Sequence, residues 1–146
     1  MSDPWVVMDA SLVIKAILPN PEFEICQMVV SELSSAHWAV PSLWTYEISN
    51  TITKAVHFKQ LTQQEGLETL QHALTLPVQL IPPDLDQSIL AYRWSLKLQR
   101  ASIYDSFYLA IAEALDADFW TADKKLFQSL QRFQLPWLHL ATPGNA

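Results

Sequence analysis

Glycine and cysteine are both scarce in this sequence of 146 residues, where Gly66, Gly144 and Cys26 are the only examples. Loops that hold nucleotide phosphates need several glycines in a short stretch, so neither a Gly-x-Gly fingerprint nor a P-loop is present. A lone cysteine forms no internal disulfide and fits a reducing, cytoplasmic setting. We expect Cys26 to be a small buried apolar residue rather than a reactive thiol.

Two further absences limit the function classes. No apolar run approaches the roughly 20 residues of a membrane span, and the N-terminal residues lack the basic stretch and apolar core of a secretory signal, so neither is expected. The histidines form no His-x-x-x-His pair and are scattered through separate elements, which argues against zinc catalysis; they are His37, His57, His72 and His139.

Short apolar runs alternate with helical patterns along the chain. Hydrophobic residues make up 50% of the sequence, enough for one core. Strands are predicted over 5–8, 37–40, 78–81, 119–121 and 137–140. Helices are predicted over 10–18, 22–35, 41–60, 62–74, 84–99, 102–115 and 124–130, with a capping box at Thr62 to Glu65 and caps at Asp84 and Ser102. This alternation predicts a parallel sheet covered on both faces by helices, in a single domain over 1–141 with a loose tail over 142–146.

Four acids stand where such a fold would bring them together. Asp9 follows the first predicted strand and Asp123 follows the fourth. Asp105 lies in the first turn of the helix over 102–115, and Glu47 lies about two turns into the helix after the second strand. Ligands bind beyond the carboxyl ends of parallel strands, so all four acids can converge at one edge if the strand order reverses there.

Four neighbouring carboxylates repel one another and would not all stay ionised alone. A hard divalent cation removes that penalty, and oxygen ligands favour Mg²⁺ or Mn²⁺ over Zn²⁺. Such a site polarises a phosphoryl oxygen and activates water for in-line attack. Ser11 and Thr121 each lie two residues from an acid of the set, so their hydroxyls can orient the carboxylates or a phosphate.

Each acid also has an ordinary structural explanation. Asp9 and Asp123 can cap the helices that follow them, and Asp105 can interact with a helix N-terminus. Glu47 can be a surface residue. The four positions taken together favour the metal-site interpretation over these separate ones.

The overall charge is acidic, with 15 Asp and Glu against 9 Lys and Arg, a net charge of −6. This argues against binding nucleic acid by charge alone. If four acids belong to one metal site, 11 acids and 9 bases remain, a net charge of −2, so a nucleic-acid substrate is not excluded. Affinity would then come from the metal and a local basic rim, for which Lys15 and Lys54 are the first candidates. Trp44, one turn before Glu47, is a candidate for stacking on a base.

Four short sequence segments resemble the PIN-domain family, and especially the VapC-type toxins of bacterial toxin–antitoxin pairs. The segments occur in the family's order, and the resemblance covers nearly the whole chain. They are Val7-Met-Asp9-Ala-Ser11, Trp44-Thr-Tyr-Glu47-Ile-Ser-Asn50, Tyr104-Asp105 through Glu113, and Trp120-Thr-Ala-Asp123. The resemblance implies a three-layer α/β/α fold with a five-stranded parallel sheet in the order 3-2-1-4-5. The sequence differs from the family pattern at Asp116, where many members have a glycine in the turn.

The resemblance also implies a function. It identifies Asp9, Glu47, Asp105 and Asp123 as the acidic quartet of a Mg²⁺- or Mn²⁺-dependent endoribonuclease, with Ser11, Thr121 and Asn50 in support. It further implies a homodimer and a small antitoxin protein as partners. The alternative is a catalytically silent PIN-like module that binds RNA or protein. A phosphate-transfer receiver domain is disfavoured, because Pro82 and Pro83 follow the third strand where that class needs an acceptor Asp.

Overall fold

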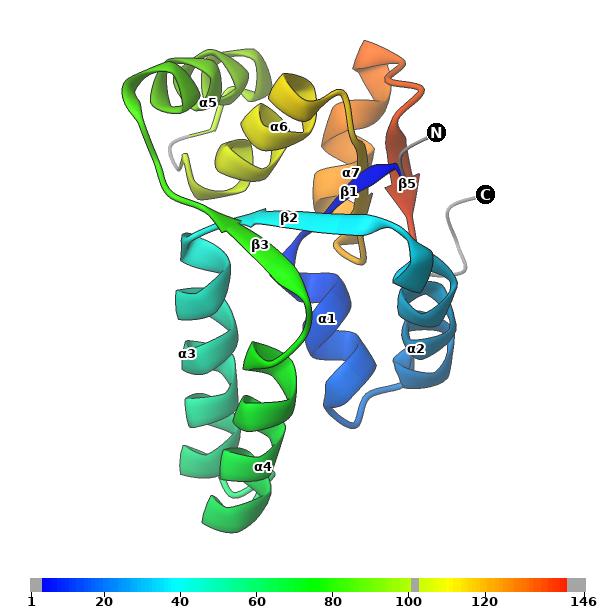
Figure 1. The fold of residues 1–146 in the computed structure, drawn as a ribbon, viewed down its shortest axis with the longest axis vertical. Helices are drawn as coiled ribbons and strands as arrows, with labels where there is room; N and C mark the ends of the chain where they lie inside the picture. The colour runs from blue at the N-terminus through cyan, green and yellow to red at the C-terminus, as the bar shows by residue number, and fades with distance from the viewer. Residues whose placement is uncertain (1–3, 101–102, 142–146) are drawn as a thin grey trace.

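Five short strands form one parallel sheet at the centre of the protein, as seen in a computed structural model that describes residues 4–100 and 103–141 (Figure 1). The strands are β1 (Trp5–Met8), β2 (His37–Pro41), β3 (Val78–Ile81), β4 (Asp118–Thr121) and β5 (Leu138–Leu140). Their order is β3-β2-β1-β4-β5, and every neighbouring pair is parallel. This confirms the order expected from the resemblance. The tail expected over 142–146 lies outside the described residues.

The apolar strand sequences follow from burial on both faces of the sheet. Val7 on the central strand β1 pairs in register with Ala39 on one side and Phe119 on the other. All three side chains are completely buried. The chain reverses direction across the sheet between β1 and β4, so the carboxyl ends of these two strands form the switch point at which α/β proteins bind ligands.

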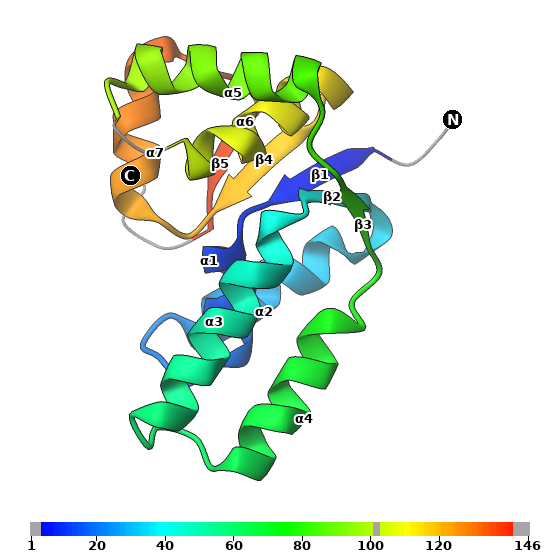
Figure 2. The same cartoon turned by 90° about the vertical axis from the view of Figure 1, so that its left-hand side faces the viewer.

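Helices cover both faces and make three layers (Figures 1 and 2). Helices α5 and α6 lie on one side of the sheet, and α1 to α4 lie on the other, where α3 and α4 form a hairpin that projects beyond the sheet. The helices are α1 (Ala10–Ile17), α2 (Phe23–Glu32), α3 (Leu43–His57), α4 (Gln63–Leu74), α5 (Leu85–Leu98), α6 (Tyr104–Leu115) and α7 (Lys124–Leu130), with 3-10 turns at Leu33–Ser35 and Gln131–Phe133. Among the described residues, no helix is both long and apolar enough to cross a bilayer.

The helix predicted over 41–60 is shorter than expected at both ends. Pro41 is the last residue of β2 and pairs with Ile81, because a proline at the end of a strand costs little in lost ladder hydrogen bonds. The helix then runs from Leu43 to His57 and ends in a turn in which Lys59 is left-handed, with φ 61°. The helix predicted over 22–35 is α2 followed by a 3-10 turn.

The predicted caps are present where the structure describes them. Thr62 Oγ1 accepts from the Glu65 N–H at 3.0 Å, and Glu65 accepts from the Thr62 N–H at 2.8 Å, so the capping box is complete. Asp84 accepts from the Gln87 N–H at 2.8 Å and caps α5. Ser102, the cap expected for α6, lies outside the described residues.

Helix α6 carries the residues that form one side of the candidate site. It packs against α5 and over the sheet, and most of its residues are buried or half-buried, with Tyr104, Glu113 and Ala114 exposed. A buried hydrogen bond of 2.7 Å between the Ser95 and Ser106 hydroxyls joins it to α5. It ends at Asp116, which adopts the left-handed conformation (φ 52°, ψ 47°) that the missing glycine would have adopted more easily.

Candidate metal and catalytic site

Asp9 is held at the junction of β1 and α1. Its side chain is 5% exposed and caps α1 through the Leu12 N–H, 3.3 Å from Oδ1. The Ser11 hydroxyl donates to Oδ1 at 2.5 Å, and the Thr121 hydroxyl donates to Oδ2 at 2.5 Å. Burial raises the pKa of Asp9 to about 7 despite these three hydrogen bonds, and the charge of Asp105 contributes to the rise.

The segment after β4 is tied to the same junction. The Ala122 N–H donates to Ser11 Oγ at 3.2 Å, and the Asp123 N–H donates to Thr121 Oγ1 at 3.0 Å. Asp123 itself caps α7, since its Oδ1 accepts from the N–H groups of Lys125 and Leu126 at 3.0 and 3.1 Å. The structural explanation as a cap therefore holds for Asp9 and Asp123. It leaves Asp123 Oδ2 without a role in the cap.

Asp105 lies in the first turn of α6 and forms an ion pair with Arg100. The Arg100 Nη1 atom is 3.0 Å from Asp105 Oδ2, and its Nη2 atom donates to Ser129 Oγ on α7 at 3.3 Å. Burial raises the pKa of Asp105, Arg100 opposes that rise, and the charge of Asp123 adds to it. No local pattern in the sequence indicates this contact between Arg100 and Asp105.

Glu47 enters the site from α3. Its Oε1 atom accepts a hydrogen bond of 2.6 Å from the Tyr108 hydroxyl on α6. Burial raises the pKa of Glu47, the Tyr108 hydrogen bond lowers it, and the charge of Asp105 raises it again. Sequence reasoning did not single out Tyr108. The available signal was its position three residues after Asp105, which places both on one face of α6.

The four acids therefore influence one another through Asp105, which acts electrostatically on both Asp9 and Glu47 and is itself affected by Asp123. In the described residues, however, no three His, Cys, Asp or Glu side chains are grouped closely enough to hold a metal ion. Each carboxylate is bound to a protein donor instead. The donor set is entirely carboxylate oxygen and is short of positive charge, so it fits a hard cation such as Mg²⁺ or Mn²⁺ in chemistry, without being pre-assembled around one.

The other predicted residues differ in placement. Lys15 Nζ is 2.7 Å from Glu22 Oε1 and 3.3 Å from the Ala122 carbonyl, next to Asp123. Asn50 and Lys54 are exposed on α3. Within the described part of the chain, neither forms a hydrogen bond or ion pair with any of the four acids. The structure thus places Lys15 at the rim of the site. Among the described residues, it shows no contact between the four acids and either Asn50 or Lys54 that would support their predicted roles.

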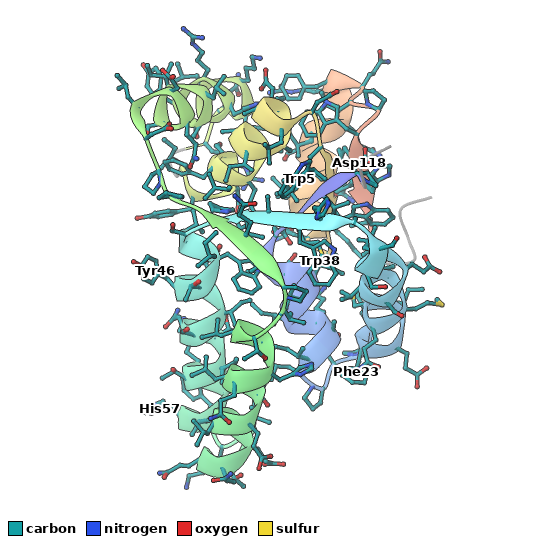
Figure 3. The ribbon with its side chains drawn as sticks, viewed as in Figure 1. Trp5, Phe23, Trp38, Tyr46, His57 and Asp118 are labelled. Carbon is teal, nitrogen blue, oxygen red and sulfur yellow. The ribbon has the colours of Figure 1, made fainter. Side chains whose placement is uncertain are left out.

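The prediction that Trp44 is available for stacking is wrong. Trp44 is 1% exposed and belongs to the core, because α3 turns this side chain toward the sheet. The exposed aromatic residue beside Glu47 is Tyr46, 73% exposed, which points away from α3 into solvent (Figure 3). Each position along a helix rotates a side chain by about 100°, so Trp44 and Tyr46, two positions apart, point about 200° apart and face opposite environments.

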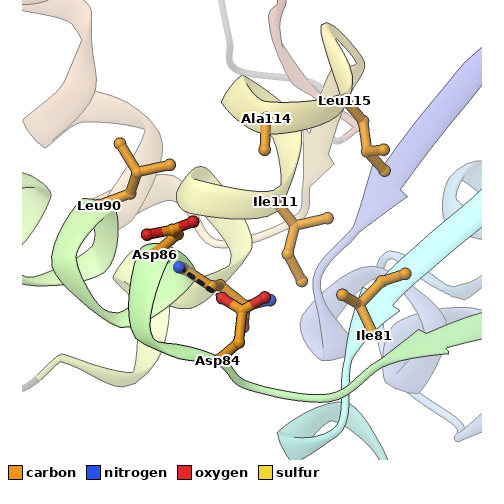
Figure 4. A pocket seen from close by; sticks show the side chains of 8 residues that line it. Ile81, Asp84, Asp86, Leu90, Ile111, Ala114 and Leu115 are labelled. Carbon is orange, nitrogen blue, oxygen red and sulfur yellow. Dashed lines mark hydrogen bonds between the residues drawn. The ribbon is translucent and has the colours of Figure 1, made fainter.

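The pocket drawn in Figure 4 is separate from the acids. It has a volume of about 190 Å³ and lies between the end of β3, the start of α5 and the later turns of α6. Its walls are mainly apolar, with Asp84 and Asp86 at the mouth, and Asp84 is the cap of α5. None of the four candidate acids lines it, so this pocket adds nothing to the candidate site.

Thr121 allows a direct test of how the site is held. Thr121→Val keeps the side-chain shape but removes a donor to Asp9 and an acceptor for the Asp123 N–H, at a position that is completely buried. We expect the free energy of unfolding to fall by about 1–3 kcal/mol, measured by urea denaturation. Thr53→Val, on the exposed face of α3, is the matched control and should change it by no more than about 0.5 kcal/mol. Equal effects of the two substitutions would contradict the hydrogen-bonded arrangement.

Comparison with known proteins supports one family. A family model described as PIN domain matches residues 7–137. Ribonuclease VapC12 of Mycobacterium tuberculosis is 29% identical over 133 residues, which is 85% of this chain and 91% of that protein.

Solved structures share the fold at low sequence identity. VapBC2 from Rickettsia felis, bound to a DNA fragment from their promoter, has a TM-score of 0.65 at 16% identity and covers 93% of this chain and 96% of that one. Mycobacterium tuberculosis VapC20, a sarcin-ricin loop cleaving toxin, has a TM-score of 0.61 at 11% identity, with 85% and 94% covered. FitAcB from Neisseria gonorrhoeae has a TM-score of 0.66 at 12% identity, with 97% and 99% covered. With the family model spanning nearly its whole length, the chain belongs to the PIN-domain family.

Proposed function

We propose that this protein is an endoribonuclease that hydrolyses RNA phosphodiester bonds and is the toxin of a toxin–antitoxin pair. The observation that carries the proposal is that Asp105 acts electrostatically on Asp9 and Glu47 and is itself affected by Asp123, in a chain whose residues 7–137 match the PIN-domain model. Relatives named as ribonucleases and as toxin–antitoxin complexes support the substrate and the partner. A cytoplasmic location and a homodimer are part of the same proposal.

The metal dependence is a further part of it. Mg²⁺ or Mn²⁺, bound by the four acids, would draw charge from the scissile phosphodiester and make water a better nucleophile. Three of the four residues fit this task because burial and the charges of neighbouring acids raise the pKa of Asp9, Glu47 and Asp105, and a bound cation would stabilise their charged forms. Ser11 and Thr121 would keep the two Asp9 oxygens in a fixed orientation.

Two basic side chains of the protein are placed to bind the phosphates of the RNA backbone. Lys15, beside the Ala122 carbonyl, and Arg100, beside Asp105, flank the acids from different elements. Arg100 uses two of its N–H groups on Asp105 and Ser129 and has others to offer a phosphate. Their proposed role is to hold the negatively charged substrate against a site that is itself negative.

The test is a cleavage assay on the purified protein. RNA should be cut with Mg²⁺ or Mn²⁺ present, leaving 5′-phosphate and 3′-hydroxyl ends, and EDTA should stop the reaction. The alternative, a silent RNA- or protein-binding module, draws its support from the absence of a pre-assembled metal cluster among the described residues. RNA that is retained in a gel-shift assay but never cut with either metal would favour the module over the enzyme.

A further inference from the structure

Tyr108 is a buried tyrosine of α6 whose hydroxyl reaches one of the candidate acids. Its side chain is 1% exposed, and its ring lies beside that of Phe119 on β4, with centroids 6.3 Å apart. The hydroxyl donates to Glu47 Oε1 at 2.6 Å, across 61 residues of sequence. A buried hydroxyl needs a partner, and here a carboxylate of the candidate site provides it.

We propose that Tyr108 is a positioning residue that holds the Glu47 carboxylate ready for a divalent cation. The Glu47 carboxylate is at the end of a long flexible side chain in the second turn of α3, whereas the Tyr108 ring on α6 packs beside Phe119 of β4. Only Oε1 is engaged by the hydroxyl, so Oε2 is left for a cation. This inference deepens the proposed metal-dependent function and depends on it.

The hydroxyl lies where three parts of the site meet. Besides Glu47, the Asp9 charge and the Ala10 backbone amide both act on Tyr108, which places the hydroxyl near the junction of β1 and α1. Burial first, and the Glu47 charge second, raise the pKa of Tyr108 above its usual range, in agreement with the hydroxyl acting as the donor to Glu47. Hydrogen-bond partners that orient metal ligands typically change metal affinity by about 10–100-fold when removed.

The experiment measures metal binding rather than cleavage. Mn²⁺ is titrated into the full-length protein at fixed pH and followed by electron paramagnetic resonance of the free ion. Tyr108→Phe should weaken binding by about 10-fold or more. Tyr92→Phe, an exposed tyrosine on α5, is the matched control and should bind as the unchanged protein does.

A double-mutant cycle identifies the route of the effect. If Tyr108 acts through Glu47, Tyr108→Phe should change Mn²⁺ affinity by less than about 2-fold once Glu47→Gln is present, because coupled residues are not additive. Glu47→Asp tests the contact from the other end, since it shortens the acid and leaves the packing of Tyr108 intact. It too should weaken binding, and adding Tyr108→Phe to it should weaken binding little further.

Four results would overturn the inference. Unchanged Mn²⁺ affinity in Tyr108→Phe would mean that the tyrosine only packs. Tighter binding would mean that it holds Glu47 away from the metal, and an undiminished loss in the Glu47→Gln background would mean that it acts elsewhere. If the unchanged protein takes up no Mn²⁺, the proposed metal dependence fails and this inference fails with it. Normal uptake by the unchanged protein and by Tyr108→Phe alike overturns this inference alone.

Discussion

Asp105→Asn should reduce RNA cleavage by roughly 100-fold or more, the range expected when one preorganised electrostatic contact is removed from an active site. Asp105 is the acid through which the other three are coupled. Asparagine has the same shape but no charge, so the proposed metal site would lose one of its four carboxylates with little change in packing. Cleavage rates in saturating Mg²⁺ would measure the effect.

The same substitution should leave the fold intact. It removes repulsion from Asp9 and Glu47, and it breaks an ion pair with Arg100 in which both side chains are about a third exposed, 30% and 36%. Partly exposed ion pairs contribute little, so the free energy of unfolding should change by less than about 1 kcal/mol. Asp116→Asn, at the residue that directly follows α6 and in the left-handed conformation that asparagine tolerates, is the control and should remain fully active. A variant at Asp105 that cuts RNA as fast as this control would refute the assigned role.

Stability without metal should fall as the pH rises from about 4 to about 7. The folded-state pKa of Asp9 is raised to about 7, whereas the unfolded chain titrates near 3.8. Between these values the folded protein binds more protons than the unfolded one, so the stabilisation is present at low pH and is lost as the pH passes through the folded pKa. A shift of about three pKa units corresponds to at most about 4 kcal/mol. Glu47 and Asp105, whose pKa values are also raised, act in the same direction.

Urea unfolding in EDTA at pH 5 and pH 7.5 would measure this dependence. Asp9→Asn should flatten it, because the position can no longer gain a charge, and Asp116→Asn should leave it unchanged. Added Mn²⁺ should restore stability at the higher pH, since a cation offsets the charges that burial disfavours. A protein in EDTA that is equally stable at both pH values, or whose pH dependence survives in Asp9→Asn, would contradict the raised pKa of Asp9.

Local patterns in the sequence were sufficient to predict the helices and strands and to locate the acids relative to them. Apolar runs with β-branched residues marked the strands, and the caps at Thr62 and Asp84 are confirmed. These local patterns gave the wrong result at two positions. Pro41, a residue type common at helix starts, is instead the last residue of a strand. Trp44 was predicted to be accessible because it lies near Glu47, but it is buried. In both cases the neighbouring strand or sheet decided the outcome, and no short window of sequence contains that information.

The sequence by itself therefore determined that acids stand at the carboxyl ends of parallel strands. The spacing of apolar residues indicates which segments are buried strands, and the alternation of strands with helices indicates that the strands run in one direction. The tertiary structure alone decided what each acid contacts. Thr121 lies 112 residues from Asp9 and Tyr108 lies 61 residues from Glu47, yet each donates a short hydrogen bond to its acid. Such contacts depend on how the sheet order and helix packing bring distant segments together. The sequence places Thr121 two residues from Asp123, but no pattern assigns it to Asp9, Tyr108 to Glu47 or Arg100 to Asp105.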